Sequence, residues 1–312
     1  MKLRGPSCLV TSIFLVCCLA CQQNTTSYTD HPRLTDKVRL QDVTFYSESL
    51  QRQMPYRVIL PSGLNSNAKL PSVYLLHGGG GEYRDWSNYS DVAKFAERGL
   101  VLVMPEGGSS YYVNAAERPR DRYEDYLTRD LISDVERKFP VATERSNRAI
   151  VGISMGGFGA ITLALKHPDL FFFAGGLSSA LDVPSRPFSI KRIGQYRQHS
   201  RIFGPWGSDS RAKNDPFVLA ATADPDQIPY MFLACGEQEG LLPANRRFAA
   251  ILKRRGFQYE FHEGPGGHDW SQWNRRLQDL FGSLQAHSGF SRTDRSIVSK
   301  KNEVRMIKST HP

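Results

Sequence analysis

The chain has 312 residues, of which 40% are hydrophobic and 23% are charged, and its formal net charge is +9. This composition is that of a globular protein, and it excludes a collagen, a coiled coil and wholesale disorder. The chain contains no run of about 20 apolar residues, so we expect no transmembrane helix.

The positive charge is concentrated at the two ends of the chain. Lys2 and Arg4 lie at the N-terminus, and residues 287–312 hold six Lys or Arg against Asp294 and Glu303. The region between these ends is nearly balanced, so we expect no nucleic-acid partner. We expect residues 287–312 to form a basic, disordered tail.

The N-terminal segment has the features of an export signal. Two positive residues precede the apolar stretch Cys8–Ala20, which is too short to span a bilayer and has the length of a secretory signal. The sequence Cys18-Leu19-Ala20-Cys21 resembles a bacterial lipoprotein signal, in which the cysteine after a small residue is lipidated. That motif usually carries Leu where this chain has Cys18.

We therefore expect residues 1–20 to be a signal peptide and Cys21 to be the lipidation site. A plain cleaved signal peptide is the alternative. The mature protein is then exported, either as a lipoprotein of the cell envelope (outer membrane or periplasm), attached to a membrane through Cys21, or as a secreted protein.

The five cysteines do not form a disulfide scaffold. Cys8, Cys17 and Cys18 would leave with the signal, Cys21 would be lipidated, and Cys235 stands alone inside an apolar run. We therefore expect no intramolecular disulfide. Cys235 has the surroundings of a small buried hydrophobic residue rather than of a nucleophile.

After a linker over residues 21–34, strand-like and helix-like stretches alternate along residues 35–286. Apolar runs predict strands at Val43–Tyr46, Tyr56–Leu60, Val73–Leu76, Val101–Met104, Ala149–Ile153, Phe171–Gly175, Tyr230–Ala234 and Gln258–His262. Helical spacing predicts helices at Asp125–Lys138, Gly156–Lys166, Arg246–Arg255 and Trp270–Gln285. Several strands are continuous apolar runs, which is typical of strands covered on both faces. The alternation predicts one α/β domain with a mostly parallel central sheet and helices on both faces.

The segment Leu181–Val218 interrupts this alternation. It is rich in Arg, Ser and Pro and has no clean period. We expect it to run over the top of the sheet, where folds of this class place their specificity elements. A plain surface excursion is the alternative.

A candidate nucleophile lies where a predicted strand meets a predicted helix. Gly152-Ile153-Ser154-Met155-Gly156 fits the pattern G-x-S-x-G and follows the apolar run Ala149–Ile153. A sharp strand–turn–helix bend lifts the serine oxygen clear of the sheet, and only glycine tolerates the close backbone approach on either side. The bend also directs helix N-terminal N–H groups toward developing negative charge. We predict that Ser154 is the nucleophile, and an ordinary Gly-rich turn is the alternative.

A base and an acid are expected later in the chain, in the order Ser, acid, His. His268 lies in the Gly-rich stretch Gly264–Trp270, after the last predicted strand and before the last helix, and it is the predicted base. The loop after strand Tyr230–Ala234 carries two candidate acids, Glu237 and Glu239. The spacing of these residues alone does not show which of the two is the acid of the triad.

The oxyanion formed during acyl transfer needs backbone N–H donors. One donor is expected from Met155, the residue after the nucleophile, and a second from the Gly78–Gly81 run that follows an earlier strand. His77 precedes this run, where a role in holding the backbone is expected. A flexible hairpin tip is the alternative reading of the four glycines.

Several segments together resemble the serine esterase family that includes esterase D (S-formylglutathione hydrolase), tributyrin-type esterases, feruloyl esterases and the mycolyltransferases. The likeness runs from about Val43 to Leu284. The segments that carry it are Tyr74–Gly79, Trp86, Val103–Asn114, Tyr123–Leu127, Gly152–Gly157, Gly267–Trp270 and Trp273. The resemblance implies an α/β-hydrolase fold.

The resemblance also implies two site residues. The family's motif Cys-Gly-x-x-Asp places its acid at Glu239, although this chain has Glu where the family has Asp. The residue after His77-Gly78 in the family supplies the second oxyanion donor, which is Gly79 here. Glutamate still reaches the imidazole in other triads, so the departure alters the loop geometry rather than the chemistry.

We therefore predict an exported serine carboxylesterase that forms an acyl-enzyme and needs no metal or organic cofactor. Its expected partners are small-molecule or carbohydrate esters with short or feruloyl acyl groups, which fit an envelope location better than S-formylglutathione. An acyltransferase on the same scaffold is one alternative, because a triad does not distinguish water from an alcohol as acceptor. A non-catalytic binding protein of the hydrolase fold is the other.

Overall fold

The computed structural model describes residues 29–65, 67–188 and 190–288. The predicted signal peptide, the predicted lipidation site Cys21 and almost all of the predicted basic tail lie outside these residues. The described residues from His31 onward form one compact unit. Within the described ranges, no helix is long and apolar enough to cross a bilayer.

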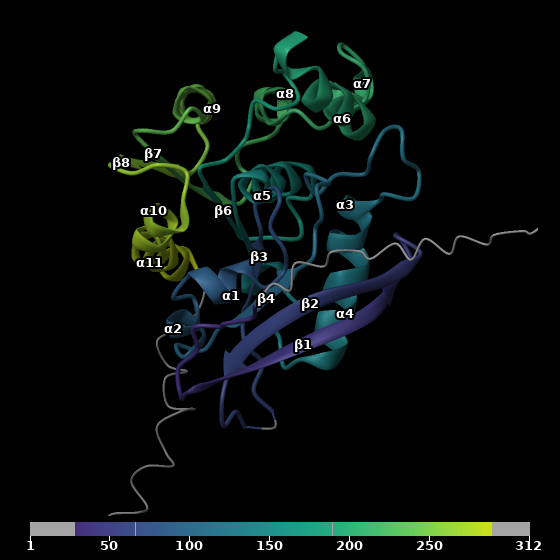
Figure 1. Cartoon of the computed structure of the whole chain (residues 1–312). Coiled ribbons are helices and arrows are strands. Elements are labelled where there is room, and N and C mark those ends of the chain that lie inside the picture. Colours follow the sequence, from purple (N-terminus) through teal and green to yellow (C-terminus); the bar gives the residue numbers. More distant parts are fainter. Residues whose placement is uncertain (1–28, 66, 189, 289–312) are drawn as a thin grey trace, which may run out of the picture. The chain divides into compact units, whose positions relative to one another are not determined.

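The described residues contain an eight-stranded sheet in the order β1-β2-β4-β3-β5-β6-β7-β8 (Figure 1). The strands are β1 (Val38–Ser47), β2 (Arg52–Pro61), β3 (Ser72–Leu76), β4 (Val101–Pro105), β5 (Arg148–Ile153), β6 (Phe173–Leu177), β7 (Tyr230–Gly236) and β8 (Tyr259–Gly264). The β1–β2 and β2–β4 pairs are antiparallel, and every other neighbouring pair is parallel. The predicted α/β fold with a mostly parallel sheet is confirmed.

The central strands are buried on both faces, as their continuous apolar runs predict. In β4, Val101 and Val103 pack into one hydrophobic cluster, whereas Leu102 and Met104 pack into a second cluster. Because successive side chains of a strand point to opposite faces, the two clusters lie on opposite faces of the sheet. Every residue of β4 is buried.

Helices cover both faces of the sheet. The helices are α1 (Asp85–Tyr89), α2 (Ala93–Ala96), α3 (Tyr123–Asp125), α4 (Ile132–Lys138), α5 (Met155–Lys166), α6 (Ile193–Phe203), α7 (Asp209–Ala212), α8 (Pro216–Thr222), α9 (Leu242–Arg255), α10 (Trp270–Arg275) and α11 (Leu277–His287). Side chains of α4, α5 and α9 belong to the first cluster, and side chains of α2 and α11 belong to the second.

Three predicted helices differ from the observed ones in their detail. The predicted helix Arg246–Arg255 begins four residues earlier, at Leu242. The predicted helix Asp125–Lys138 includes a π-helical stretch, Tyr126–Leu131, before α4 begins. The predicted helix Trp270–Gln285 is divided at Arg276 into α10 and α11. The apolar spacing continues across this division, so the sequence pattern gives no sign of it.

The segment 181–218 contains α6, α7 and the start of α8, and it follows the C-terminal end of β6. The backbone carbonyl groups of Ile202 and Arg201 at the end of α6 accept hydrogen bonds from Ala116 and Glu117, in the loop that follows β4. The segment therefore covers the carboxyl ends of parallel strands, where an active site of this fold class is expected. In Figure 1 its helices lie together above α5.

Cys235 is fully buried in β7 and is not in a disulfide. Burial raises the pKa of its thiol to about 12, so the thiol stays protonated and unreactive at neutral pH. The predicted role of Cys235 as a small buried hydrophobic residue is confirmed.

Candidate active site

Ser154 lies at the sharp turn between β5 and α5. Its backbone φ is +54°, a value that non-glycine residues rarely adopt. The two flanking glycines are required by close backbone contacts, because a Cβ on Gly152 would overlap the backbone of Gly156, and a Cβ on Gly156 would overlap the carbonyl of Leu76. The G-x-S-x-G pattern thus forms a sharp bend with the geometry expected of a nucleophile elbow, and it leaves Ser154 half-buried.

The loop between β8 and α10 brings His268 to this serine. The hydroxyl of Ser154 lies 2.9 Å from Nε2 of His268, and Nδ1 of His268 lies 2.7 Å from Oε2 of Glu239. With the proton on Nδ1, the imidazole donates to the carboxylate and accepts from the hydroxyl, as a general base must. Glu239 is fully buried at its side chain, whereas the side chain of His268 is 41% exposed.

The structure brings Glu239 and not Glu237 to His268. The loop after β7 turns back on itself, with the N–H of Glu239 donating to the carbonyl of Gly236 at 3.2 Å. Glu237 is exposed, and its own N–H donates to Gly264. The turn separates two side chains that an extended loop would place on one face.

A residue that sequence reasoning missed holds the other oxygen of Glu239. The hydroxyl of Ser178 donates to Oε1 at 2.6 Å, and the N–H of Gly236 donates to the same oxygen at 2.8 Å. The indole N–H of Trp273 donates to the Ser178 oxygen at 2.8 Å, and the Trp273 ring packs edge-on against His268, with centroids 5.1 Å apart. Ser178 and Trp273 therefore link the acid back to the base.

The glycine run after β3 lies beside Ser154. A Cβ on Gly78 would lie 3.5 Å from the Cβ of Ser154, and a Cβ on Gly79 would lie 3.9 Å from the Cβ of Met155. Among the described residues, no acceptor engages the backbone N–H of Gly79 or of Met155. Both N–H groups are thus available to an anionic oxygen formed near Ser154.

His77 holds this loop in place. Its Nδ1 donates to the carbonyl of Gly78 at 2.8 Å, and its Nε2 accepts from the N–H of Gly107 at 2.9 Å. The hydroxyl of Tyr112 donates to the His77 carbonyl at 3.0 Å. The expected backbone role of His77 is confirmed, and the loop after β4, which carries Tyr112, braces the loop after β3.

Comparison with known proteins identifies the family and agrees with the fold. The Esterase family model ("Putative esterase") matches residues 47–290. An acetyl esterase of Caldicellulosiruptor saccharolyticus is 28% identical over 257 residues, which cover 78% of this chain and 96% of that protein. The mycolyltransferase Ag85B of Mycobacterium avium is 30% identical over 273 residues, which cover 75% of this chain and 80% of that protein.

A solved structure shows the same arrangement of the chain. FphF, a fluorophosphonate-binding serine hydrolase of Staphylococcus aureus, superposes with a TM-score of 0.69 at 27% identity. The match covers 81% of this chain and all of that one. The fold is thus that of an α/β-hydrolase.

The chain belongs to the Esterase family, and the resemblance noted from its sequence motifs is confirmed. It is a serine hydrolase that acts on carboxylic ester bonds.

Proposed function

We propose that the protein is an exported carboxylesterase that hydrolyses short-chain acyl or carbohydrate-linked esters through an acyl-enzyme on Ser154. The observation that carries this proposal is the hydrogen-bonded series from Ser154 through His268 to Glu239, at 2.9 and 2.7 Å. Each member has the partner that its role requires, and the order in the chain is Ser, acid, His.

The first half of the reaction acylates the serine. Nε2 of His268 takes the hydroxyl proton as Oγ of Ser154 attacks the carbonyl carbon of the ester. The N–H groups of Gly79 and Met155 bind the oxyanion, and Glu239 stabilises the imidazolium through Nδ1. The tetrahedral intermediate then expels the alcohol, which receives the proton from Nε2.

The second half returns the enzyme to its starting state. Nε2 of His268 takes a proton from a water molecule, whose oxygen attacks the acyl carbon, and the same two N–H groups bind the second oxyanion. Collapse of this intermediate breaks the bond to Oγ of Ser154, which regains its proton from His268 and releases the carboxylic acid.

The substrate class rests on the relatives and on the N-terminal sequence. An acetyl esterase and an endo-1,4-beta-xylanase/feruloyl esterase of Xylanibacter ruminicola, 25% identical over 261 residues, support short acyl and carbohydrate-linked esters. The apolar stretch Cys8–Ala20 and Cys21 support export and attachment to a membrane. Nucleic acid is not an expected partner.

Acyl transfer to an alcohol is the second candidate function. The 30% identity to a mycolyltransferase favours it, and the chemistry differs only in whether water or an alcohol attacks the acyl-enzyme. The products made from a p-nitrophenyl ester with and without added alcohols or sugars distinguish the two activities.

Turnover of p-nitrophenyl esters from acetate to octanoate tests the proposal. We expect the wild-type protein to release p-nitrophenol most rapidly from short acyl chains and the Ser154→Ala variant to release none above background. A folded wild-type protein that turns over no ester in this series contradicts the proposal.

A further inference from the structure

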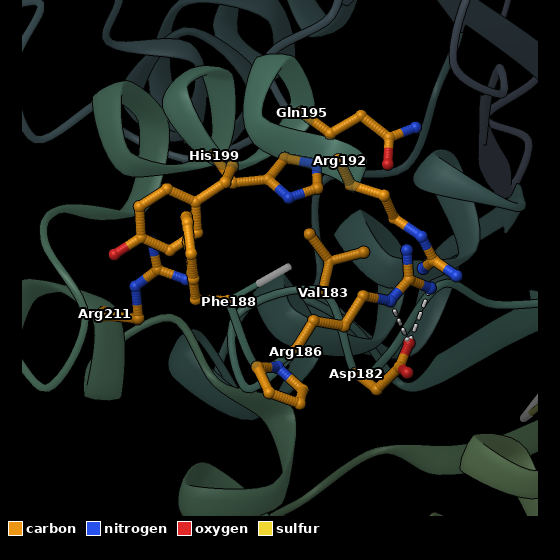
Figure 2. Close-up of a pocket in the computed structure, with 10 residues that line it drawn as sticks. Asp182, Val183, Arg186, Phe188, Arg192, Gln195, His199 and Arg211 are labelled. Atoms are coloured by element: carbon orange, nitrogen blue, oxygen red, sulfur yellow. Dashed lines mark hydrogen bonds and ion pairs between the residues drawn. The ribbon is translucent and has the colours of Figure 1, made fainter. Parts of the chain in front are cut away.

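A pocket of about 340 Å³ lies in the segment between β6 and β7, apart from the triad (Figure 2). Its volume lies within the range of small-ligand sites, which is about 300 to 1,000 Å³. Three arginines line it, namely Arg186, Arg192 and Arg211. Of the lining residues that the structure describes, only Asp182 carries a carboxylate.

The three arginines differ in how directly a carboxylate pairs with them. Asp182 pairs with Arg186, accepting from Nε at 3.0 Å and from Nη2 at 2.7 Å. Within the described part of the chain, neither Arg192 nor Arg211 forms an ion pair. Figure 2 shows the guanidinium groups of Arg186 and Arg192 extending toward the same side of the pocket. The lining therefore carries a net positive charge.

Arg211 is the buried cation of this lining. The residue is 5% exposed, and its guanidinium donates to the carbonyl groups of Gly204 and Pro184 at 2.8 to 3.0 Å. Its guanidinium also lies over the ring of Trp206, 5.8 Å from the centroid, and the nearby carboxylate of Asp215 offsets part of its charge without forming an ion pair. Because none of the described carboxylates forms a direct ion pair with Arg211, its charge adds to that of Arg192 in attracting an anion to the pocket.

The positive charge of the pocket affects the protonation of His199, which also lines it. Burial, together with the charges of Arg186 and Arg211, lowers the pKa of His199 to about 4, so the ring is neutral at pH 7. Its Nε2 lies 3.4 Å from the hydroxyl of Tyr111. The positive charge of the pocket therefore comes from the arginines, and it disfavours any further cation.

Both walls of the pocket are connected to the nucleophile elbow. The N–H of Ala180 donates to the carbonyl of Ser154 at 3.1 Å, and Asp182 follows two residues later. Tyr111 packs edge-on against Phe158, whose own N–H donates to the same carbonyl at 3.0 Å. Since each residue advances the chain by at most 3.8 Å, the backbone of Asp182 lies within roughly 15 Å of Ser154.

We propose that this pocket binds an anionic group of the ester substrate, a carboxylate or a phosphate, at a distance from the scissile bond. The inference rests on the proposed esterase function and specifies its substrate class. The planar fork of arginine matches both groups, because two of its N–H donors can bind two oxygens of one anion. Phe188 and Tyr196, whose rings meet edge to face at 5.0 Å, offer an apolar contact to the body of the substrate.

Matched charged and neutral esters test the proposal on both sides of the ester bond. On the acyl side, mono-4-nitrophenyl adipate is compared with 4-nitrophenyl hexanoate. On the alcohol side, 4-acetoxybenzoate and 4-acetoxyphenyl phosphate are each compared with methyl 4-acetoxybenzoate, which also separates carboxylate from phosphate recognition. The readout is the ratio of kcat/KM for the charged ester to kcat/KM for its neutral partner.

In at least one pair we expect the wild-type ratio to favour the charged ester by about tenfold or more, as hydrogen bonds to a charged partner usually provide. Arg192→Gln should remove most of this preference, and 0.5 M NaCl should reduce it by screening. Arg197→Gln is the matched control, since Arg197 is an exposed arginine of α6, the helix that Arg192 immediately precedes, and lies outside the lining; it should leave the ratio unchanged. Wild-type ratios near one in every pair, or equal losses in both variants, overturn the proposal.

Binding to the Ser154→Ala variant separates failure of the pocket from failure of the esterase function. Calorimetry with the intact esters should give at least tenfold tighter binding of a charged ester than of its neutral partner. Equal affinities overturn the anion site even if the wild-type enzyme turns over both esters. In another outcome, the variant binds the charged ester more tightly while the wild type turns over no ester. That result supports the anion site and overturns the proposed function.

Discussion

The Glu239→Gln substitution tests how a buried carboxylate controls the base. One oxygen of Glu239 accepts from Gly236 and Ser178, and the other accepts from Nδ1 of His268. A glutamine keeps an oxygen for the first two donors but presents an NH2 group to Nδ1. The imidazole proton is then driven to Nε2, where it faces the hydroxyl of Ser154 and prevents the ring from accepting the serine proton.

The expected loss follows from this change of tautomer. In a serine protease the equivalent carboxylate-to-amide change lowers kcat by about 10⁴, which corresponds to about 5 kcal/mol of transition-state stabilisation. The side chain of His268 is 41% exposed, so water can take over part of the role of the carboxylate. We therefore expect kcat to fall by between about a hundredfold and 10⁴.

The assay is kcat for p-nitrophenyl acetate, and Glu237→Gln is the matched control. Glu237 lies on the same loop and undergoes the same chemical change, but it is exposed, and the carboxylate that bonds to His268 is that of Glu239. We expect its kcat to stay within about tenfold of wild type, and thermal unfolding should verify that both variants are folded. The reverse pattern would identify Glu237 as the acid, and near-normal activity in both would mean that another carboxylate orients His268.

Ser154→Ala should lower kcat by about 10⁶, as loss of the nucleophile does in subtilisin. A fluorophosphonate probe should label Ser154 and no other serine. Retention of a tenth of the wild-type activity would exclude Ser154 as the nucleophile. Ser178→Ala should lower kcat by about tenfold with little change in KM. The substitution removes a hydrogen bond to the charged Glu239, which positions the base rather than the substrate. An unchanged kcat would refute the positioning role of Ser178. Gly156→Ala should destabilise the fold by about 1–3 kcal/mol in urea unfolding, since its Cβ would overlap backbone atoms of β3; wild-type stability would contradict the tight elbow. Cys21→Ala should move the protein from the detergent phase to the aqueous phase in a detergent-partition experiment; an intact mass showing an unmodified mature N-terminus elsewhere would rule out lipidation.

The sequence identified those parts of the fold that depend on local pattern. Continuous apolar runs located the central strands, because a strand buried on both faces leaves no polar positions. The nucleophile elbow was visible because its glycines are required by contacts between near neighbours in the chain. Helix α6 was not predicted, because only Ile202 and Phe203 of its residues are buried and its apolar period is correspondingly weak.

The role of Ser178 could not be predicted for a different reason. Its two partners in the site, Glu239 and Trp273, lie 61 and 95 positions away in the sequence. No local motif marks such a residue, because its function depends on three elements that meet only in the folded sheet. The choice between Glu237 and Glu239 likewise depends on a loop turn that spacing does not reveal, and family resemblance rather than local chemistry pointed to Glu239.

The crossover from β6 to β7 has a consequence for how enzymes of this kind diversify. The helices α6 and α7 lie within this single connection, whereas Ser154, Glu239 and His268 follow other strands. The entropic cost of closing a loop rises by only about 0.6 kcal/mol for each doubling of its length. Insertions in the exposed parts of this connection therefore cost the sheet little, provided that the buried apolar contacts of the segment are kept. The residues that make these contacts are Leu181, Val183, Ile202 and Phe203. Exchange of this one connection between relatives would transfer selectivity as a module while the hydrolytic apparatus stays intact.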